Sequence, residues 1–328
     1  MPAASPPPTV WYAAQHAAVL CDVPSLAALV VAGADATAFL QGQLSNDAAR
    51  LTPDVWQYTT FNSPKGRMLA SIILWRDADA FRAVLAADLA AAVRKRLAMY
   101  VLRSKVDLRE DDARLFGVGG PAARSVLAAR LGEAPAERRL VHVRGVDVLG
   151  LPGDRWLVHG PAAAVAEMRV LLGADIQVAP AEVWAWLTIR AGVPVITAAT
   201  QDRFVPQTAN LDVLQGISFQ KGCYTGQEIV ARMQYLGRLK ERLVLAHTDA
   251  SEVAPGMPVF SPAFEGQACG TIVNAAPAPD GGHDVLAVAQ IAAVPAGLRL
   301  GNAEGPVLAV LPFPYPVPEP AAPRRMGR

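Results

Sequence analysis

The cysteine at position 223 has the sequence surroundings of a reactive thiol. Lys221 lies two residues before it, and the apolar spacing after it predicts a short amphipathic helix that begins at Thr225. The first amides of a helix are unpaired and the helix dipole is positive there. A cysteine just before a helix and near a lysine favours thiolate over thiol, so the pattern predicts a nucleophilic Cys223.

The start of this helix also carries a capping signal. Thr225 and Glu228 have the spacing of a capping box, in which each side chain accepts a hydrogen bond from the other residue's amide. The alternative interpretation of Cys223 is packing, because a free cysteine is often buried as a small apolar residue. The local sequence leaves both interpretations open.

Basic residues gather around the same stretch, namely Arg203, Lys221, Arg232, Arg238, Lys240 and Arg242. One interpretation is a solvated face paired with Glu228 and Glu241. The other is a binding site for a ligand with several carboxylates or phosphates, which Lys and Arg contact well.

Other chemistries are not supported by the sequence. The three cysteines show no Cys-x-x-Cys pair, the five histidines are isolated, and no Gly-x-Ser-x-Gly elbow is present. A glycine pattern at 117–122 matches a dinucleotide fingerprint, but a strand, a tight turn and a helix explain it as well. Net charge is +1, and no apolar run is long enough to span a membrane. We expect a cytoplasmic protein with no metal site built by this chain alone.

The predicted elements interleave strands and helices through the first two thirds of the chain. Residues 56–61 and 67–75 form a predicted hairpin, residues 88–100 a helix and residues 101–108 a strand. After residue 239, short apolar runs are separated by Pro and Gly, which is typical of a small β-barrel. The sequence therefore predicts an α+β class with antiparallel sheets, flexible ends at 1–17 and 313–328, and a barrel at 239–312.

The residues 221–228, Lys-Gly-Cys-Tyr-Thr-Gly-Gln-Glu, resemble the signature of the folate-binding YgfZ family. That family is related to the aminomethyltransferase of the glycine cleavage system. Flanking stretches at 39–47, 65–67, 204–207, 210–212 and 216–219 resemble the family too, so the similarity covers roughly residues 18–312. It implies an aminomethyltransferase-like fold, with two α+β subdomains at 18–238 and the barrel arranged around a central opening.

The resemblance also implies which groups form the site. Tetrahydrofolate or another folate derivative is the implied cofactor, with a transient iron–sulfur cluster as a further ligand. Cys223 is the candidate catalytic thiol, assisted by Lys221. The implied folate-binding residues are Gln207, Asn210, Asp212, Lys221, Gly222, Tyr224, Gln227, Glu228, Arg232 and Arg238.

Two acidic positions of the transferases are replaced in this chain. The transferases carry an aspartate in a Gly-Gly-x-x-Asp-Asp stretch, and the matching residues 65–71 contain no acid. They also carry a pterin-binding glutamate in a hairpin like residues 153–157, where the acid is again replaced. The resemblance therefore implies the transferase fold without glycine-cleavage chemistry, and it leaves enzymatic activity open.

Three functions follow from this resemblance. The first is a tetrahydrofolate-binding protein that assists the assembly or maintenance of iron–sulfur proteins and uses Cys223. The second is a tetrahydrofolate-dependent one-carbon transferase or demethylase. The third is an RNA-associated factor in transfer-RNA modification, which the basic cluster would serve. The implied partners are folate and iron–sulfur proteins or their assembly machinery, with RNA open and no membrane.

Overall fold

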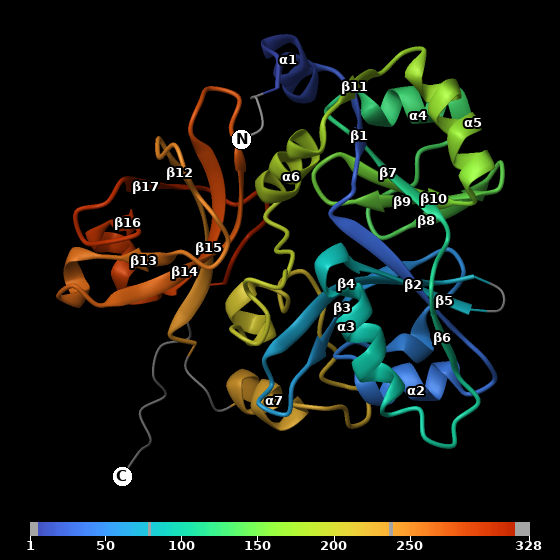
Figure 1. Ribbon diagram of the computed structural model, residues 1–328, viewed down its shortest axis with the longest axis horizontal. Helices are drawn as coiled ribbons and strands as arrows, with labels where there is room; N and C mark the ends of the chain where they lie inside the picture. Colours follow the sequence, from blue (N-terminus) through green and yellow to red (C-terminus); the bar gives the residue numbers. More distant parts are fainter. Residues whose placement is uncertain (1–5, 78–79, 236–238, 319–328) are drawn as a thin grey trace.

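The computed structural model describes residues 6–77, 80–235 and 239–318. Figure 1 shows three β-structures around the helix α6: a five-stranded sheet at lower right, a six-stranded sheet at upper right and a barrel at left. The α+β class and the C-terminal barrel predicted from sequence are confirmed. In the part of the chain that is described, no helix is long and apolar enough to cross a membrane.

The five-stranded sheet is wholly antiparallel and has the order β3-β4-β5-β2-β6. Its strands are β2 (Leu26–Ala32), β3 (Trp56–Asn62), β4 (Met68–Arg76), β5 (Ala80–Ala86) and β6 (Asp107–Glu110). The helices α2 (Ala36–Gln43) and α3 (Ala87–Ala98) belong to this unit, and α3 packs on the sheet. The aliphatic run of β4 is buried, which suits a strand covered on both sides.

The six-stranded sheet has the order β11-β1-β7-β10-β9-β8, and β1 pairs with β11 in parallel. Its strands are β1 (Val19–Asp22), β7 (Arg114–Gly119), β8 (Leu140–Val143), β9 (Val146–Leu151), β10 (Arg155–Gly160) and β11 (Gln177–Ala179). The helices α4 (Ala123–Leu131) and α5 (Ala162–Gly173) cover one side. The glycine pattern at 117–122 thus lies at the end of β7 and before α4, as a strand, a turn and a helix.

The closed barrel has the order β12-β15-β14-β13-β16-β17. Its strands are β12 (Glu241–Thr248), β13 (Pro258–Phe260), β14 (Ala268–Pro277), β15 (His283–Gln290), β16 (Leu298–Leu300) and β17 (Val307–Leu311). Short 3₁₀ turns are η1 (Ala48–Arg50), η2 (Pro206–Ala209), η3 (Pro262–Phe264) and η4 (Ile291–Ala296). Between the sheets and the barrel lie α6 (Ala181–Arg190) and α7 (Gln227–Tyr235).

Several predicted segments differ from the structure. The N-terminal residues predicted to be flexible include the helix α1 (Pro8–His16), because Trp11 is buried edge-on against Trp186 at 5.5 Å between ring centroids. The predicted tail begins with a docked segment, in which the Tyr315 hydroxyl donates to the Gly192 carbonyl at 2.7 Å. Residues 101–106 form a turn rather than a strand, because the backbone of Leu102 has φ +46°.

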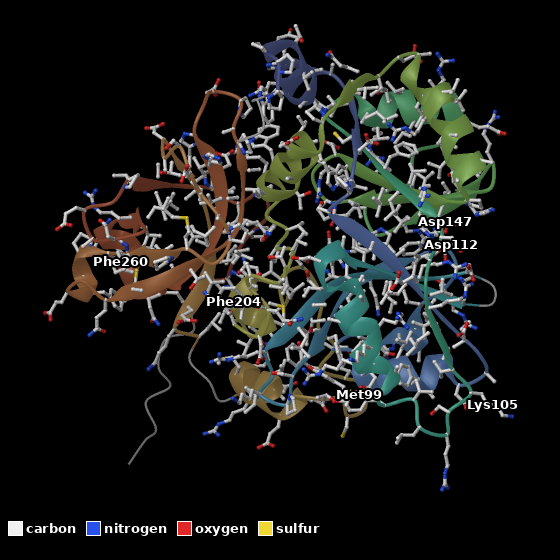
Figure 2. All side chains as sticks on the ribbon, viewed as in Figure 1. Met99, Lys105, Asp112, Asp147, Phe204 and Phe260 are labelled. Atoms are coloured by element: carbon white, nitrogen blue, oxygen red, sulfur yellow. The ribbon has the colours of Figure 1, made fainter. Side chains whose placement is uncertain are left out.

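A buried ion cluster joins the two sheets. On β10, His159 places Nε2 3.0 Å from Asp111 Oδ2 and Nδ1 3.4 Å from Asp147 Oδ2. Trp75 Nε1 of β4 also donates to Asp147, and Arg82 of β5 lies 3.3 Å from Asp111. Burial acts to lower the pKa of His159, but its hydrogen bonds to the two carboxylates raise it. Figure 2 shows Asp147 at this junction.

Candidate functional site

The loop that carries Cys223 packs against the turn between β3 and β4 through two glycines. Gly226 has φ +80°, and a Cβ there would lie 2.4 Å from the Ser63 carbonyl oxygen. Gly66 has φ +70°, and its Cβ would lie 2.8 Å from Cβ of Ile229. Only glycine accepts both the left-handed backbone and this contact. The structure thus brings the stretch around residue 66 and the 221–228 signature into contact.

Lys221 ties the same loop to a third stretch, the end of α2. Its Nζ donates to the carbonyl oxygens of Gln41 and Leu44, both at 2.6 Å, and lies 5.0 Å from the Tyr224 ring centroid. These carbonyls are the unpaired acceptors at a helix C-terminus. Burial lowers the pKa of Lys221 to about 8, against the raising effect of Asp47. Its contacts are therefore those of a helix cap, and the predicted role beside Cys223 stays a prediction.

The signature helix begins later than its sequence suggested. α7 starts at Gln227, whose amide donates to the Tyr224 carbonyl at 3.1 Å. Among the described residues, Thr225 and Glu228 form no reciprocal side-chain bonds, so the capping-box prediction is wrong. The reason is the left-handed Gly226 between them, since a capping box needs an extended residue followed at once by helix.

Cys223 is the exposed cysteine of this chain. All three cysteines are described and free, and Cys21 and Cys269 are buried. Burial raises the pKa of the Cys21 thiol to about 12, which keeps that group protonated and unreactive. The neighbouring Tyr224 is buried, so it anchors the loop while Cys223 faces solvent. The packing interpretation therefore does not apply to Cys223.

The basic residues near the signature include both internally bound and exposed side chains. Arg242 Nη1 is bound internally, at 3.0 Å from Asp212 Oδ2 and 2.7 Å from the Gln207 carbonyl oxygen. Arg203, Arg232 and Lys240 are exposed. Arg238 lies outside the described residues. Asp212, predicted to bind folate, is accordingly engaged by an internal arginine.

The other predicted folate-binding residues divide into buried and exposed groups. Gln207 Nε2 donates to the Val230 carbonyl at 2.7 Å, and Asn210 Nδ2 lies 3.4 Å from the Tyr315 hydroxyl. Both are buried, and their Oε1 and Oδ1 atoms have no hydrogen-bond partner in the protein. The exposed or half-buried group is Gly222, Gln227, Glu228 and Arg232.

A separate cavity lies at the centre of the molecule, between the two sheets, α6 and the barrel strand β14. Its volume is about 230 Å³. Apolar side chains make most of its wall, and the polar side chains that line it are Ser25, Tyr58, Ser71, Arg155, Thr188, Thr197 and Asn274. A mostly apolar cavity with a few converging polar groups is the usual form of a small-molecule site.

Arg155 is the charged group of this cavity and is almost completely buried. Its Nε donates to the Pro152 carbonyl at 2.9 Å and its Nη1 to Thr188 Oγ1 at 2.7 Å, while Nη2 has no partner in the protein. The guanidinium lies 5.2 Å from the ring centroid of Trp184. Burial lowers the pKa of Arg155, but arginine remains protonated in proteins. The wall of the cavity therefore holds a fixed cation that interacts with the Tyr58 hydroxyl.

A row of unpaired polar groups leads away from Arg155 along β3. Tyr58, Thr60 and Asn62 are all buried and, being two residues apart, lie on one face of the strand. The Tyr58 and Thr60 hydroxyls and both side-chain polar atoms of Asn62 have no hydrogen-bond partner in the protein. Burial raises the pKa of Tyr58 to about 12, so the hydroxyl stays a donor. Buried polar groups without partners are uncommon and point to a ligand or to water.

This row also relates the cavity to the Cys223 loop. β3 advances about 3.3 Å per residue, so the turn at 63–67 lies on the order of 16 Å along the strand from Tyr58. Figure 1 agrees, with α7 at the lower end of the β3–β4 hairpin and α6 near its other end. The thiol and the cavity are thus separate places on one pair of strands.

No carboxylate lines the cavity in the part of the chain that the structure describes. The stretch 65–71, compared above with the aspartate-bearing stretch of the transferases, does reach the cavity through Ser71. Ser71 Oγ accepts from the Ile196 amide at 3.0 Å, which holds it in place. The wall therefore lacks a side chain that could accept a proton from an amine at neutral pH.

Sequence reasoning missed Arg155, Tyr58 and Trp184 as cavity residues. Trp184 was predicted to be core and is buried, but it also walls the cavity. Two glycines of β7 leave room for this wall: a Cβ on Gly117 would lie 2.3 Å from Trp184, and one on Gly119 2.7 Å from Leu187. The sequence signal for this site was Arg155, a charged residue at the start of the mostly apolar strand run 155–160.

Comparisons with known proteins identify relatives of this chain. The family model described as the GCVT N-terminal domain matches residues 11–152. The tRNA-modifying protein YgfZ of Escherichia coli O157:H7 (strain EC4115 / EHEC) is 36% identical over 227 residues, which cover 68% of this chain and 70% of that protein. The protein of the same name from Escherichia coli O7:K1 (strain IAI39 / ExPEC) is 35% identical over the same shares.

A solved structure supports the fold across almost the whole chain. The glycine cleavage system aminomethyltransferase T from Bartonella henselae matches with a TM-score of 0.72 and 17% identity, covering 92% of this chain and 87% of that chain. The aminomethyltransferase-like fold that the sequence predicted is confirmed.

Proposed function

Since this chain belongs to the YgfZ family, we propose that it binds a folate in the central cavity and serves tRNA modification, with Cys223 as its working thiol. The name of the relatives supports the link to tRNA, and the related fold supports a folate. The observation that carries the proposal is the cavity, in which Arg155 is fixed by Pro152 and Thr188, and in which Arg155 Nη2 and the Tyr58 hydroxyl have no group of the protein beside them except the Arg155–Tyr58 interaction itself.

The residues of the cavity fit a folate. A cavity of about 150 Å³ admits a benzene ring, so about 230 Å³ has room for a bicyclic pterin. The Trp184 indole offers an aromatic surface, and Arg155 offers a donor to a ring carbonyl or ring nitrogen.

Each residue has a defined part in this proposal. Arg155 orients the ligand through Nη2 while Pro152 and Thr188 fix the other guanidinium nitrogens. The apolar walls exclude water and strengthen that contact. A reduced folate, when bound, supplies a carrier for one-carbon groups. Because no described lining residue is Asp or Glu, the chain's own groups favour binding over the aminomethyl transfer of the related enzymes.

We further propose that Cys223 assists the assembly or maintenance of iron–sulfur proteins that take part in tRNA modification. Its exposure suits contact with a partner rather than with a ligand inside the cavity. Within the described residues, no three His, Cys, Asp or Glu side chains gather into a metal site. Iron or a cluster fragment held by Cys223 would therefore take its other ligands from the partner.

Calorimetric titration of tetrahydrofolate tests the folate proposal. We expect Arg155→Met to bind about 10- to 100-fold more weakly than the native protein, because one hydrogen bond from a charged donor is lost. Arg138→Met is the matched control. Like Arg155, Arg138 donates to a backbone carbonyl, through Nη2 to that of Leu214, but Arg138 does not line this cavity. Equal affinities for native protein and Arg155→Met, or no binding by the native protein at millimolar folate, would overturn the proposal.

The thiol proposal needs a separate readout. We expect Cys223→Ser to bind tetrahydrofolate normally and yet fail to restore the modified nucleosides of bulk tRNA in cells that lack the native protein. Mass spectrometry of digested tRNA measures this. Full restoration by Cys223→Ser would remove the thiol from the function while leaving the folate site intact.

A further inference from the structure

The turn after α3, residues 99–105, presents large apolar side chains to solvent. Leu102 is 89% exposed, Met99 71% and Tyr100 37%. Figure 2 shows Met99 and Lys105 on the lower part of the molecule, below the five-stranded sheet. Single exposed apolar residues are ordinary, but several within four positions mark a contact surface.

The backbone of this turn is held in one conformation. The amides of Met99, Tyr100 and Val101 continue α3 with 3₁₀-type bonds, and Ser104 donates to the Val101 carbonyl at 2.8 Å. Leu102 has φ +46°, a left-handed conformation that costs a non-glycine residue roughly 1 kcal/mol. Asp35 closes the turn, because its Oδ2 accepts from the Lys105 amide at 2.7 Å. The apolar tip is therefore preorganised.

Cations outnumber acids around this tip, where Asp35 is the acid in contact with the turn. The sequence from residue 89 to residue 106 contains no Asp or Glu. Arg94 pairs with Glu110 at 3.5 Å. The remaining cations of the stretch are exposed and, among the described residues, form no ion pair: Lys95, Arg96, Arg103 and Lys105. Such a patch favours a polyanion.

We infer that the 99–105 turn is an RNA-binding surface, at which Met99 and Leu102 enter between unstacked bases of a loop while the four cations contact phosphates. Apolar wedges between base steps and cationic contacts to the backbone are a known combination in nucleic-acid binding. A protein partner fits less well, because lysine is depleted in protein–protein interfaces. The inference rests on the proposed service to tRNA modification and names the surface that would hold the RNA.

Fluorescence anisotropy with labelled unfractionated tRNA tests the cations. We expect Arg103→Gln with Lys105→Gln to lower the slope of log affinity against log salt by about 1.4, as for two lost phosphate contacts, and to weaken binding about tenfold at 0.1 M salt. Arg124→Gln with Arg144→Gln removes the same charge from exposed sites on the six-stranded-sheet unit and should change neither. Equal losses in both pairs would show non-specific attraction and overturn the inference.

A second variant tests the apolar tip. In Leu102→Asn the new asparagine tolerates positive φ, so the turn should stay folded. We expect it to weaken binding of a hairpin RNA with an open loop about tenfold and to leave binding of a fully paired duplex unchanged. Unchanged hairpin binding would overturn the inference. The same variants should bind tetrahydrofolate as the native protein does. If the native protein bound tetrahydrofolate but no tRNA, the RNA-binding surface would be rejected and the folate proposal would stand.

Discussion

The Cys223 loop and the central cavity are built in opposite ways. The loop is a contiguous signature, exposed at its thiol, and it is positioned by backbone contacts at Gly66 and Gly226. The cavity is assembled from residues far apart in sequence, and its distinctive groups are the buried side chains of Arg155 and Tyr58, which interact with each other. The molecule thus keeps an exposed thiol apart from an interior cavity, and the turn that contacts the thiol loop lies on the order of 16 Å along β3 from Tyr58.

If the interior depends on buried polar groups, the largest loss of stability should come from the ion cluster that joins the two sheets. His159→Gln leaves Asp111 and Asp147 buried without their shared partner, so we expect a loss of about 3 kcal/mol in the free energy of unfolding at pH 6. Urea denaturation measures it. His142→Gln is the control, since His142 contacts the same Asp147 but is 70% exposed.

The same cluster should give the native protein a pH dependence. The pKa of His159 is raised in the folded state, so its contribution is complete below the unfolded value of about 6.5 and is lost as pH rises through the folded value. The carboxylates of Asp111 and Asp147 have lowered pKa values, and the guanidinium of Arg82 and the imidazole of His142 also face the cluster. Stability that does not fall between pH 6 and pH 9 more steeply in native protein than in His159→Gln would contradict this account.

The loop should respond instead to a change of backbone. Gly226→Ala forces a left-handed alanine against the Ser63 carbonyl, and we expect a cost of about 2 kcal/mol. Gly222→Ala is the matched control, because no atom lies within 4 Å of its added Cβ and it is exposed. Differential scanning calorimetry measures both. Similar stabilities for the two variants would mean that the glycine contact does not position the loop.

The smallest change in stability should come from the thiol itself. Cys223→Ser should alter the free energy of unfolding by less than about 0.5 kcal/mol, because the side chain is exposed. Cys21→Ser, which puts a hydroxyl in the core, should cost about 1–3 kcal/mol. Iodoacetamide should modify Cys223 first, and mass mapping of the labelled peptides checks this. Faster labelling of Cys21 or Cys269 would contradict the placement of the loop.

The sequence predicted the loop better than the cavity for a physical reason. A signature of consecutive residues keeps its order in the fold, so the place of Cys223 shortly before a helix could be anticipated. Its details could not, because the left-handed Gly226 and the capping role of Lys221 depend on residues 63 and 41–44. The hairpin, α3 and the barrel followed from local apolar patterns, and these predictions are confirmed.

The cavity could not be read from local patterns. Its wall draws on β3, β4, β9, β10, α6 and β14, and tertiary packing alone brings these elements together. Trp184 has the pattern of a core residue, and Arg155 lies in a strand run in which its burial is not visible. The docked Tyr315 was missed because a proline-rich end gives no sign of the pocket that receives it.

A crystal structure with bound 5-formyltetrahydrofolate tests the central claim most directly. The account predicts the pterin ring in the cavity beside Trp184, with a ring acceptor about 2.7–3.1 Å from Arg155 Nη2. Cys223 should remain outside contact with the ligand. Folate bound only at the Cys223 loop, or a cavity without folate in crystals saturated with it, would contradict the claim.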